Sequence, residues 1–144
     1  MSDQSETSEY GGRRDTESRD LGKTLSQISN EMVGLHKRYY GKGPTKAKTY
    51  MVDDVVICLL GGGLTTVERT LLGDGRVETV HAMRRTFQEA MEQEFTDIIE
   101  RAIGRKVIAY MSQIHADPDI AIEIFVLEPI EGTGWAITSE RLMH

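Results

Sequence analysis

A short run of cations between His36 and Lys48 is the strongest chemical feature of this sequence. The run holds five formal positive charges and no acid, contributed by Lys37, Arg38, Lys42, Lys46 and Lys48. Because the whole chain carries a formal charge of −6, the residues outside the run sum to −11. The contrast predicts a cationic surface on an otherwise anionic protein, and these five side chains are the candidate partner-binding site.

Three uses of this basic run remain open. Its cations can simply complement the dipole at the end of a helix, or they can contact a protein or a lipid headgroup. They can also bind RNA or single-stranded DNA, where two adjacent tyrosines would offer stacking surfaces. Tyr39 falls on the apolar stripe of the predicted helix and is expected to be buried, which weakens the nucleic-acid interpretation.

Metal and acid–base chemistry find little support in the residue spacing. No two histidines stand at the i,i+4 spacing of a helical metal site, because they are scattered at His36, His81, His115 and His144. His115 and Asp117 could transfer protons at a loop, but both are also ordinary turn residues beside Pro118. We expect no bound metal and no cofactor.

The cysteine and the glycine run are also better explained by structure than by catalysis. Cys58 is the single cysteine, so no internal disulfide can form, and its apolar surroundings predict core packing. The run from Gly61 to Gly63 precedes a helix start, as in a phosphate cradle. However, no Lys-Ser or Lys-Thr follows, and Glu68 already claims the free backbone donors. We expect a protein without enzymatic activity.

Composition and periodicity divide the chain into three parts. Residues 1–19 are expected to form a disordered acidic tail, residues 20–128 a single domain, and residues 129–144 a loosely ordered C-terminal tail. The domain opens with a helix whose apolar residues recur every three or four positions, at Leu21, Leu25, Ile28, Met32, Leu35 and Tyr39. The loop motif Gly41, Gly43 and Pro44 ends this helix.

Two hairpins and two further helices follow. Residues 48–52 and 55–60 are β-rich and are split by the turn Asp53-Asp54. Thr65 and Glu68 form a capping box that starts a short helix ending near Gly73. A long amphipathic helix covers residues 80–102, with Arg84 expected mostly outside its apolar face, and Gly104 ends it. Residues 106–112 and 120–127 form the second hairpin.

The αββαββ order predicts an α+β fold of two layers. Tight hairpins make antiparallel pairs, so we expect a four-stranded, mainly antiparallel sheet with helices on one face. The other face would carry Tyr50, Val52 and part of the apolar run 55–60, and we expect a homodimer to cover it. The longest aliphatic stretch is far shorter than the roughly 20 residues of a membrane-spanning helix. A cytoplasmic location is expected.

Four short motifs resemble one known family over roughly residues 21–128. They are Tyr40-Gly41-Lys42-Gly43-Pro44, Leu64-Thr65-Thr66-Val67-Glu68, Gly104-Arg105-Lys106-Val107 and Phe125-Val126-Leu127. Together they resemble the MpsC-like family, long carried as a domain of unknown function and named for a sodium-translocating, membrane-potential-generating system. The family motif usually has Arg where this chain has Lys42.

The resemblance implies a small accessory or regulatory subunit of a membrane ion-transport or bicarbonate-supply system. It carries over no catalytic residue, and it places the protein in the cytoplasm or peripherally at the inner face of the membrane. From the residues themselves we expect docking through the basic run and the Gly41–Lys48 loop. The alternative is a module that binds RNA or single-stranded nucleic acid with the same 37–48 segment.

Overall fold

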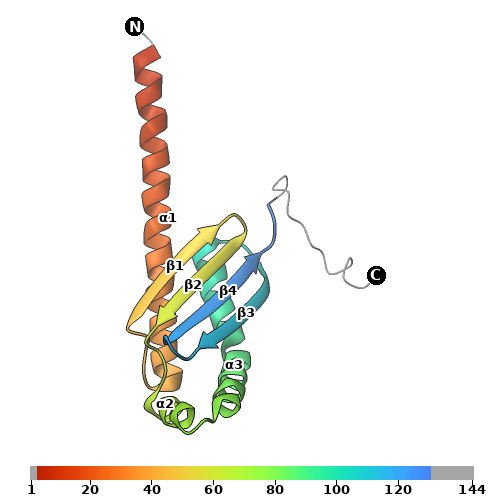
Figure 1. Ribbon diagram of the computed structural model, residues 1–144. Coiled ribbons are helices and arrows are strands. Elements are labelled where there is room, and N and C mark those ends of the chain that lie inside the picture. The colour runs from red at the N-terminus through yellow and green to blue at the C-terminus, as the bar shows by residue number, and fades with distance from the viewer. Residues whose placement is uncertain (1–2, 131–144) are drawn as a thin grey trace.

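The computed structural model describes residues 3–130, with side chains from Glu17 onward. Its elements follow one another in the order αββααββ (Figure 1). They are α1 (Asp3–Tyr40), β1 (Lys46–Val52), β2 (Val55–Gly61), α2 (Thr66–Gly73), α3 (Val77–Ile103), β3 (Val107–His115) and β4 (Ile120–Leu127). The expected helices and hairpins are all present, and α2 is the short capped helix.

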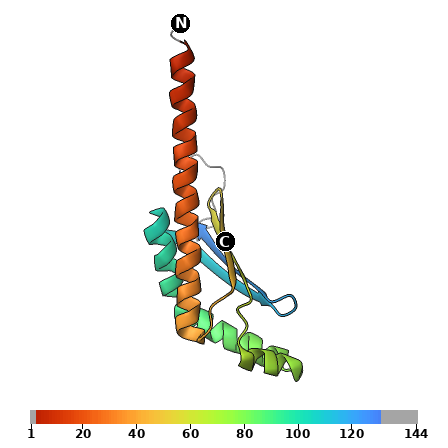
Figure 2. The ribbon, with the colours of Figure 1, turned by 90° about the vertical axis from the view of Figure 1, so that its left-hand side faces the viewer.

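The four strands form one fully antiparallel sheet in the order β1-β2-β4-β3. Both hairpins therefore contribute one central strand and one edge strand, and β2 joins β4 at the middle of the sheet. The helices α1 and α3 lie on the same side of this sheet (Figure 2). The predicted α+β fold, with helices on one face, is confirmed.

The N-terminal end of α1 lies within the segment for which a tail is predicted. Composition predicts a disordered tail over residues 1–19, whereas α1 already begins at Asp3. Extending a formed helix costs far less free energy than nucleating one, because each added residue makes one backbone hydrogen bond. The expected C-terminal tail over 129–144 lies, beyond Ile130, outside the described residues.

The C-terminal half of α1 packs its apolar stripe on the sheet and on α3. Ile28, Met32 and Leu35 are buried as predicted, but Tyr39 is 39% exposed and the expectation of its burial is wrong. The buried face continues instead through His36 to Tyr40, which packs against the core. A repeat of 3.6 residues drifts by about 20° per heptad from strict alternation of three and four, which moves the buried face from the line of Tyr39 toward Tyr40.

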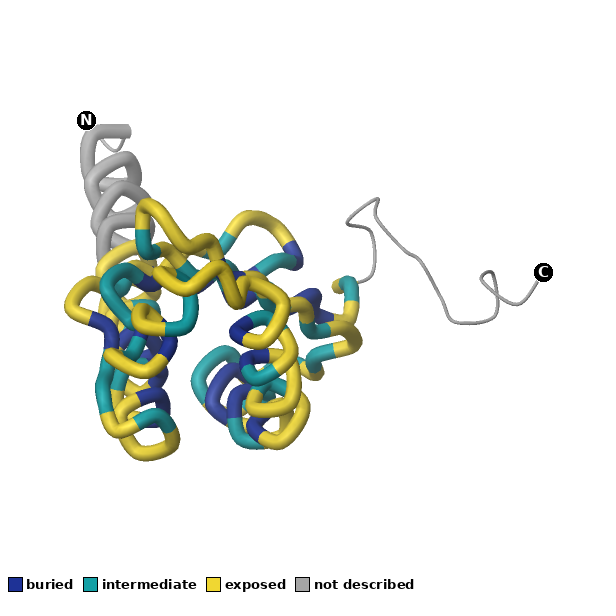
Figure 3. Tube along the Cα trace, turned by 60° about the horizontal axis from the view of Figure 1, so that its bottom comes forward, coloured by how far each residue is buried: buried dark blue, intermediate teal, exposed yellow. Residues whose placement is uncertain are grey.

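The main core lies between the sheet and the two long helices. The sheet contributes Val56, Cys58, Phe125 and Leu127, and α3 contributes buried residues including Met91, Phe95, Ile98 and Ile99. Along the helices, buried residues alternate with exposed ones, as amphipathic packing requires (Figure 3). Cys58 is fully buried, and its burial raises the pKa of the thiol to about 12.

Candidate functional site

The predicted partner-binding cations separate into two groups in the structure. Arg38 and Lys42 are engaged: Arg38 pairs with Glu94 at 3.2 Å, and Lys42 Nζ donates to the Leu64 carbonyl at 3.2 Å. The other three, Lys37, Lys46 and Lys48, form no ion pair within residues 17–130. These three exposed side chains, here called the unpaired lysines, keep the charge that can attract an anionic partner.

The Gly41–Thr45 loop connects α1, which carries Lys37, to β1, which carries Lys46 and Lys48. Gly41 has φ +77°, a left-handed conformation that ends α1, and its N–H donates to the Lys37 carbonyl at 2.9 Å. A Cβ at Gly43 would lie 3.2 Å from the Val33 carbonyl oxygen and 3.3 Å from Lys37 Cβ. The loop therefore folds back onto the last turns of α1, and only a residue without a side chain fits there without displacement.

Pro44 and Thr45 then lead into the edge strand β1. The backbone N–H of Thr45 donates to the Gly61 carbonyl at 2.8 Å, which starts the β1–β2 hairpin. Lys46 and Lys48 follow at alternate positions of β1, so they share one face of the sheet. The neighbouring position on that face is Tyr50, whose ring centroid lies 5.9 Å from Lys48 Nζ. The unpaired lysines thus span the end of α1 and the start of β1.

The glycine run does not offer a free phosphate cradle. The capping box is confirmed: Glu68 N donates to Thr65 Oγ1 at 3.2 Å, and Thr65 N donates to Glu68 Oε1 at 2.9 Å. The N–H of Leu64 donates to Asp119 Oδ2 at 3.1 Å. Two carboxylates of the chain itself therefore occupy the donors that an anion would use.

A buried ion pair between Arg84 and Glu68 lies next to the glycine run and the start of α2. Arg84 donates from Nε to Glu68 Oε2 at 2.5 Å and from one terminal nitrogen to Oε1 at 2.6 Å. That nitrogen also donates to the Gly63 carbonyl at 3.0 Å. The guanidinium carbon stands 4.0 Å from the centroid of the Tyr40 ring, in cation–π geometry. Side chains from α2, α3 and α1 are thus joined in one polar contact.

This pair fixes the charge state of its members. Burial alone would raise the pKa of the Glu68 carboxyl, but hydrogen bonds from Arg84 and from the Thr65 backbone outweigh it, so the pKa is lowered. Burial likewise opposes the charge of Arg84, and Glu68 restores it, so the pKa of Arg84 is raised. Burial raises the pKa of Tyr40 to about 12. The pair stays ionised and Tyr40 stays neutral at physiological pH.

A second buried polar group connects α1 to the sheet. His36 Nδ1 lies 2.7 Å from the Met32 carbonyl, and its Nε2 lies 3.7 Å from Glu123 Oε1. Tyr110 donates to the other oxygen of Glu123 at 2.5 Å, and burial is the main cause that raises the pKa of Tyr110. The His36 ring stacks on Tyr40 with 5.8 Å between centroids. The two buried groups therefore meet at Tyr40.

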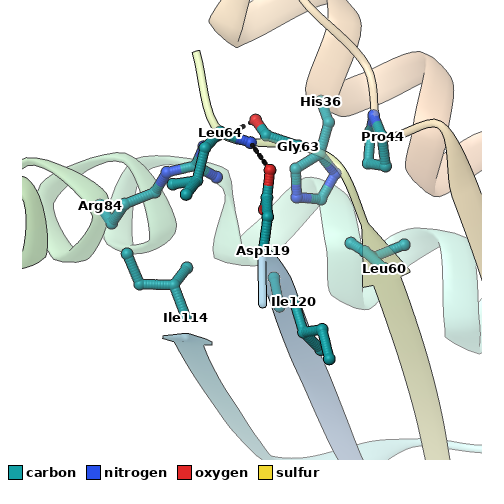
Figure 4. Close-up of a pocket in the computed structure, with 10 residues that line it drawn as sticks. His36, Pro44, Leu60, Gly63, Leu64, Arg84, Ile114, Asp119 and Ile120 are labelled. Atoms are coloured by element: carbon teal, nitrogen blue, oxygen red, sulfur yellow. Dashed lines mark hydrogen bonds between the residues drawn. The ribbon is translucent and has the colours of Figure 1, made fainter. Parts of the chain in front are cut away.

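A very small cavity opens beside these groups, and a wider, open groove of about 490 Å³ lies elsewhere, between α1 and α3. The small cavity measures about 10 Å³, the space that roughly one water molecule needs. Figure 4 shows His36, Arg84 and Asp119 around it, together with apolar side chains such as Leu60 and Ile114. This small cavity holds no organic substrate, and His36, Arg84 and Asp119 around it are each engaged with other groups of the protein.

The residues considered for acid–base and metal chemistry do not form a site among the described residues. His115 ends β3 and Asp117 lies on the exposed turn that follows, and His115 Nδ1 contacts the Pro118 carbonyl at 2.8 Å. Neither of them lines the cavity. Within the described residues, no group of three or more His, Cys, Asp or Glu side chains could hold a metal ion. In the same part of the chain, no helix is long and apolar enough to cross a bilayer.

The burial of Arg84 is the main feature of the site that was not predicted from the sequence. The residue was expected mostly outside the apolar face of the long helix, but it is only 4% exposed. A signal was present: Arg84 stands four residues after Val80 and seven before Met91, and both of these are fully buried. At helical spacing this places Arg84 on the core face, where a charge needs a partner.

Comparison with known proteins agrees with the motifs. A family model described as "Na+-translocating membrane potential-generating system (MpsC)" matches residues 21–129. Two proteins of Bacillus subtilis (strain 168) are similar: uncharacterized protein YrhF and uncharacterized protein YbcI. YrhF is 27% identical over 111 residues, 75% of this chain and 90% of YrhF. YbcI is 28% identical over 109 residues, 74% of this chain and 86% of YbcI.

No solved structure matches the chain. The motif residues named from the sequence, at the Gly-Pro loop, the capping box and β4, all fall inside the span of the family model. The match covers most of the chain, including all four strands, α2 and α3. This chain belongs to the MpsC family.

Proposed function

We propose that this chain is a non-enzymatic accessory subunit of a membrane system that generates the membrane potential, and that it docks through the unpaired lysines. The family description supplies the kind of system. The observation that carries the docking surface is that Lys37, Lys46 and Lys48 have no carboxylate partner among the described residues, in a chain whose net charge is −6. An anionic patch on a membrane-system component fits such a surface.

The internal arrangement supports a docking role over a catalytic one. The buried carboxylates Glu68 and Glu123 and the buried Arg84 are engaged with partners inside the fold. The cavity beside them is the size of a water molecule. These polar groups thus hold the Gly41–Thr45 loop and the start of α2 in place. The side chains that a partner can reach lie on the surface.

Self-association is part of the proposal. A homodimer would present two copies of the unpaired lysines to one assembly. Joining two weak contacts raises the overall affinity because the second contact becomes intramolecular. This suits a surface of exposed lysines, since each exposed ion pair contributes only about 0–1 kcal/mol.

Affinity capture from the native host tests the docking proposal. The tagged chain and its Lys37→Glu/Lys46→Glu/Lys48→Glu variant are purified from detergent-solubilised membranes, and co-purifying proteins are identified by mass spectrometry. We expect subunits of an ion-translocating complex with the native chain and their loss with the variant. A matched control reverses three other exposed cations, Lys23, Arg85 and Lys106, and should retain the complex. Equal capture by both triple variants would contradict the proposal.

One observation favours nucleic-acid binding as a second candidate. Tyr39 and Tyr50 are 39% and 45% exposed, and each stands beside a cation, Arg38 and Lys48 respectively. Exposed rings next to cations are the elements of a single-strand stacking surface. This candidate predicts that the chain binds RNA or single-stranded DNA with an affinity that falls steeply as salt rises. Electrophoretic shifts at about 50 mM and 200 mM salt test it, and no shift at the lower salt dismisses it.

A further inference from the structure

The face of the sheet that points away from α1 and α3 is apolar and open. Strand residues alternate between the two faces, and the inner positions such as Val56, Cys58 and Phe125 are fully buried. The outer positions include Val52, Met111 and Leu59, which are 59%, 52% and 39% exposed. Register pairs Ile57 with Ile124 and Leu59 with Ile122, so the two central strands place aliphatic side chains at the middle of this face.

Among the described strand residues, none on this outer face carries a carboxylate, although the chain has 23 acidic residues. The sheet acid Glu123 pairs with Cys58 in the register and points inward, where it is 2% exposed. The charged side chains of the outer face are Lys46 and Lys48, on the edge strand β1. An acidic protein that keeps one broad face free of acid has a surface suited to apolar contact rather than to water.

We propose that a second copy of this chain covers the outer face of the sheet, so that two sheets pack face to face. Both edges of the sheet argue against pairing edge to edge. Exposed lysines on β1 discourage the addition of another strand. On the other edge, the register shift between Val107 and Ala109 in β3 disrupts the regular ladder. The face remains as the apolar surface available to another copy.

The face is large enough for a dimer of the smaller stable class. Four strands spaced about 4.8 Å apart, each seven to nine residues long at about 3.3 Å per residue, span roughly 19 Å by 25 Å. Two such faces present about 1,000 Å² in projection, and side-chain relief raises the accessible area toward the roughly 1,200 Å² of specific interfaces. Two identical apolar faces can pack without opposite charges on the two copies. This matches the lack of carboxylates among the described strand residues of the outer face.

The resulting assembly has four layers, with helices outside and two sheets inside, about 10 Å apart. A two-fold axis near the paired residues Ile57 and Ile124 would bring the central strands of both copies together. Lys46 and Lys48 would then stay at the rim with their ammonium groups in water. This inference rests on the proposed self-association, but not on docking by the unpaired lysines.

Sedimentation equilibrium of the full chain at micromolar concentrations tests the interface. The native chain should sediment as a dimer. Met111→Glu places a carboxylate on the face, where it is solvated in a monomer but buried without a partner in the dimer. Leu59→Glu places one beside Lys48, its register neighbour on β1. We expect Met111→Glu to raise the dimer dissociation constant at least about 100-fold, and Leu59→Glu to raise it less because Lys48 can pair with the new carboxylate. Val67→Glu, at a 63% exposed position of α2, is the matched control and should leave it unchanged.

A second variant guards against misfolding. Leu59→Thr keeps a strand-favouring residue and should weaken the dimer in the same direction but less, with an unchanged circular dichroism spectrum. A dimer that survives both glutamate variants overturns the interface. A native chain that is monomeric at every concentration tested overturns the interface as well. This also holds if the monomer binds vesicles of anionic lipid, because the face would then contact lipid and not a second copy.

The interface and the proposed function fail separately. If Leu59→Glu is monomeric and still captures the membrane complex, the docking proposal stands. The dimer is then not needed to strengthen the contact. A Lys37→Glu/Lys46→Glu/Lys48→Glu variant that remains dimeric but captures nothing leaves the interface intact and confirms that the lysines dock. Loss of the dimer in this lysine variant alone, with Met111→Glu still dimeric, overturns the face-to-face arrangement.

Discussion

Arg84 of α3 and Glu68 of α2 form a bidentate ion pair that is almost completely buried, with side-chain exposures of 5% and 2%. The same Glu68 caps the start of α2, and the same Arg84 reaches the Gly63 carbonyl and the Tyr40 ring. One pair therefore ties three helices and the glycine run together. It fixes the start of α2 beside the Gly41–Thr45 loop, which connects the two elements that carry the unpaired lysines.

Removing one partner of this pair should destabilise the fold strongly. Arg84→Met leaves the Glu68 carboxylate buried without its partner, which costs about 3–5 kcal/mol in free energy of unfolding. Arg38→Ala is the control, because its pair with Glu94 is exposed and contributes at most about 1 kcal/mol. Urea unfolding followed by circular dichroism measures both. The double variant Arg84→Met/Glu68→Leu should recover part of the loss, and a single variant as stable as the native chain would refute this role.

The lowered pKa of Glu68 predicts a loss of stability in acid. The unfolded chain carries Glu68 at its ordinary pKa of 4.5, whereas the folded chain holds it lower. The unfolded state therefore takes up the proton first as pH falls, and this part of the stability is full above about pH 4.5 and declines below it. Comparing urea midpoints across pH 7 to 3 should show a flatter acid limb for Glu68→Gln. Parallel curves for the two proteins would contradict the assignment.

The Cys58 thiol should be inert in the folded chain. Its pKa of about 12, raised by burial, leaves almost no thiolate at pH 8. We expect Ellman's reagent to react with it only as fast as the protein unfolds, and at once in denaturant. Rapid reaction under native conditions would show that β2 opens locally.

Gly41 and Gly22 should respond to alanine in opposite directions. Gly41 has a left-handed backbone at the end of α1, so Gly41→Ala should cost about 1–2 kcal/mol. Gly22 lies inside α1 with open space around its Cα, so Gly22→Ala should stabilise by about 0.5–1 kcal/mol. Thermal unfolding of the two variants provides the comparison. Equal shifts in both would mean that the positive φ at Gly41 imposes no requirement.

The fold was predictable because local signals and burial agree over most of the chain. β4 carries β-branched residues at Ile120, Ile122, Ile124 and Val126, and Thr65 and Glu68 stand at the spacing of a capping box, so each element could be assigned without tertiary contacts. Gly104, with φ +75°, ends α3 where the apolar periodicity stops. These are the positions at which propensity and packing favour the same structure.

The polar interior was not predictable from the same signals. A charged residue on a helix is exposed unless an oppositely charged partner lies in the interior. The partner of Arg84 stands 16 residues away on another helix. The choice between Tyr39 and Tyr40 depends on how α1 rotates over the sheet, which only packing decides. Pairing of Arg38 with Glu94, 56 residues apart, likewise required the fold. The basic run was therefore found from composition, and its unpaired members only from the structure.

Membrane potential in the native host tests the docking account most directly. The gene for the chain is replaced by the Lys37→Glu/Lys46→Glu/Lys48→Glu variant or by the Lys23→Glu/Arg85→Glu/Lys106→Glu control, at equal protein abundance, and a potential-sensitive dye is read in sodium medium. We predict that the first variant lowers the potential as much as deletion of the chain does, while the control matches the native strain. A normal potential in the strain carrying the first variant, or in the deletion strain, would contradict the account.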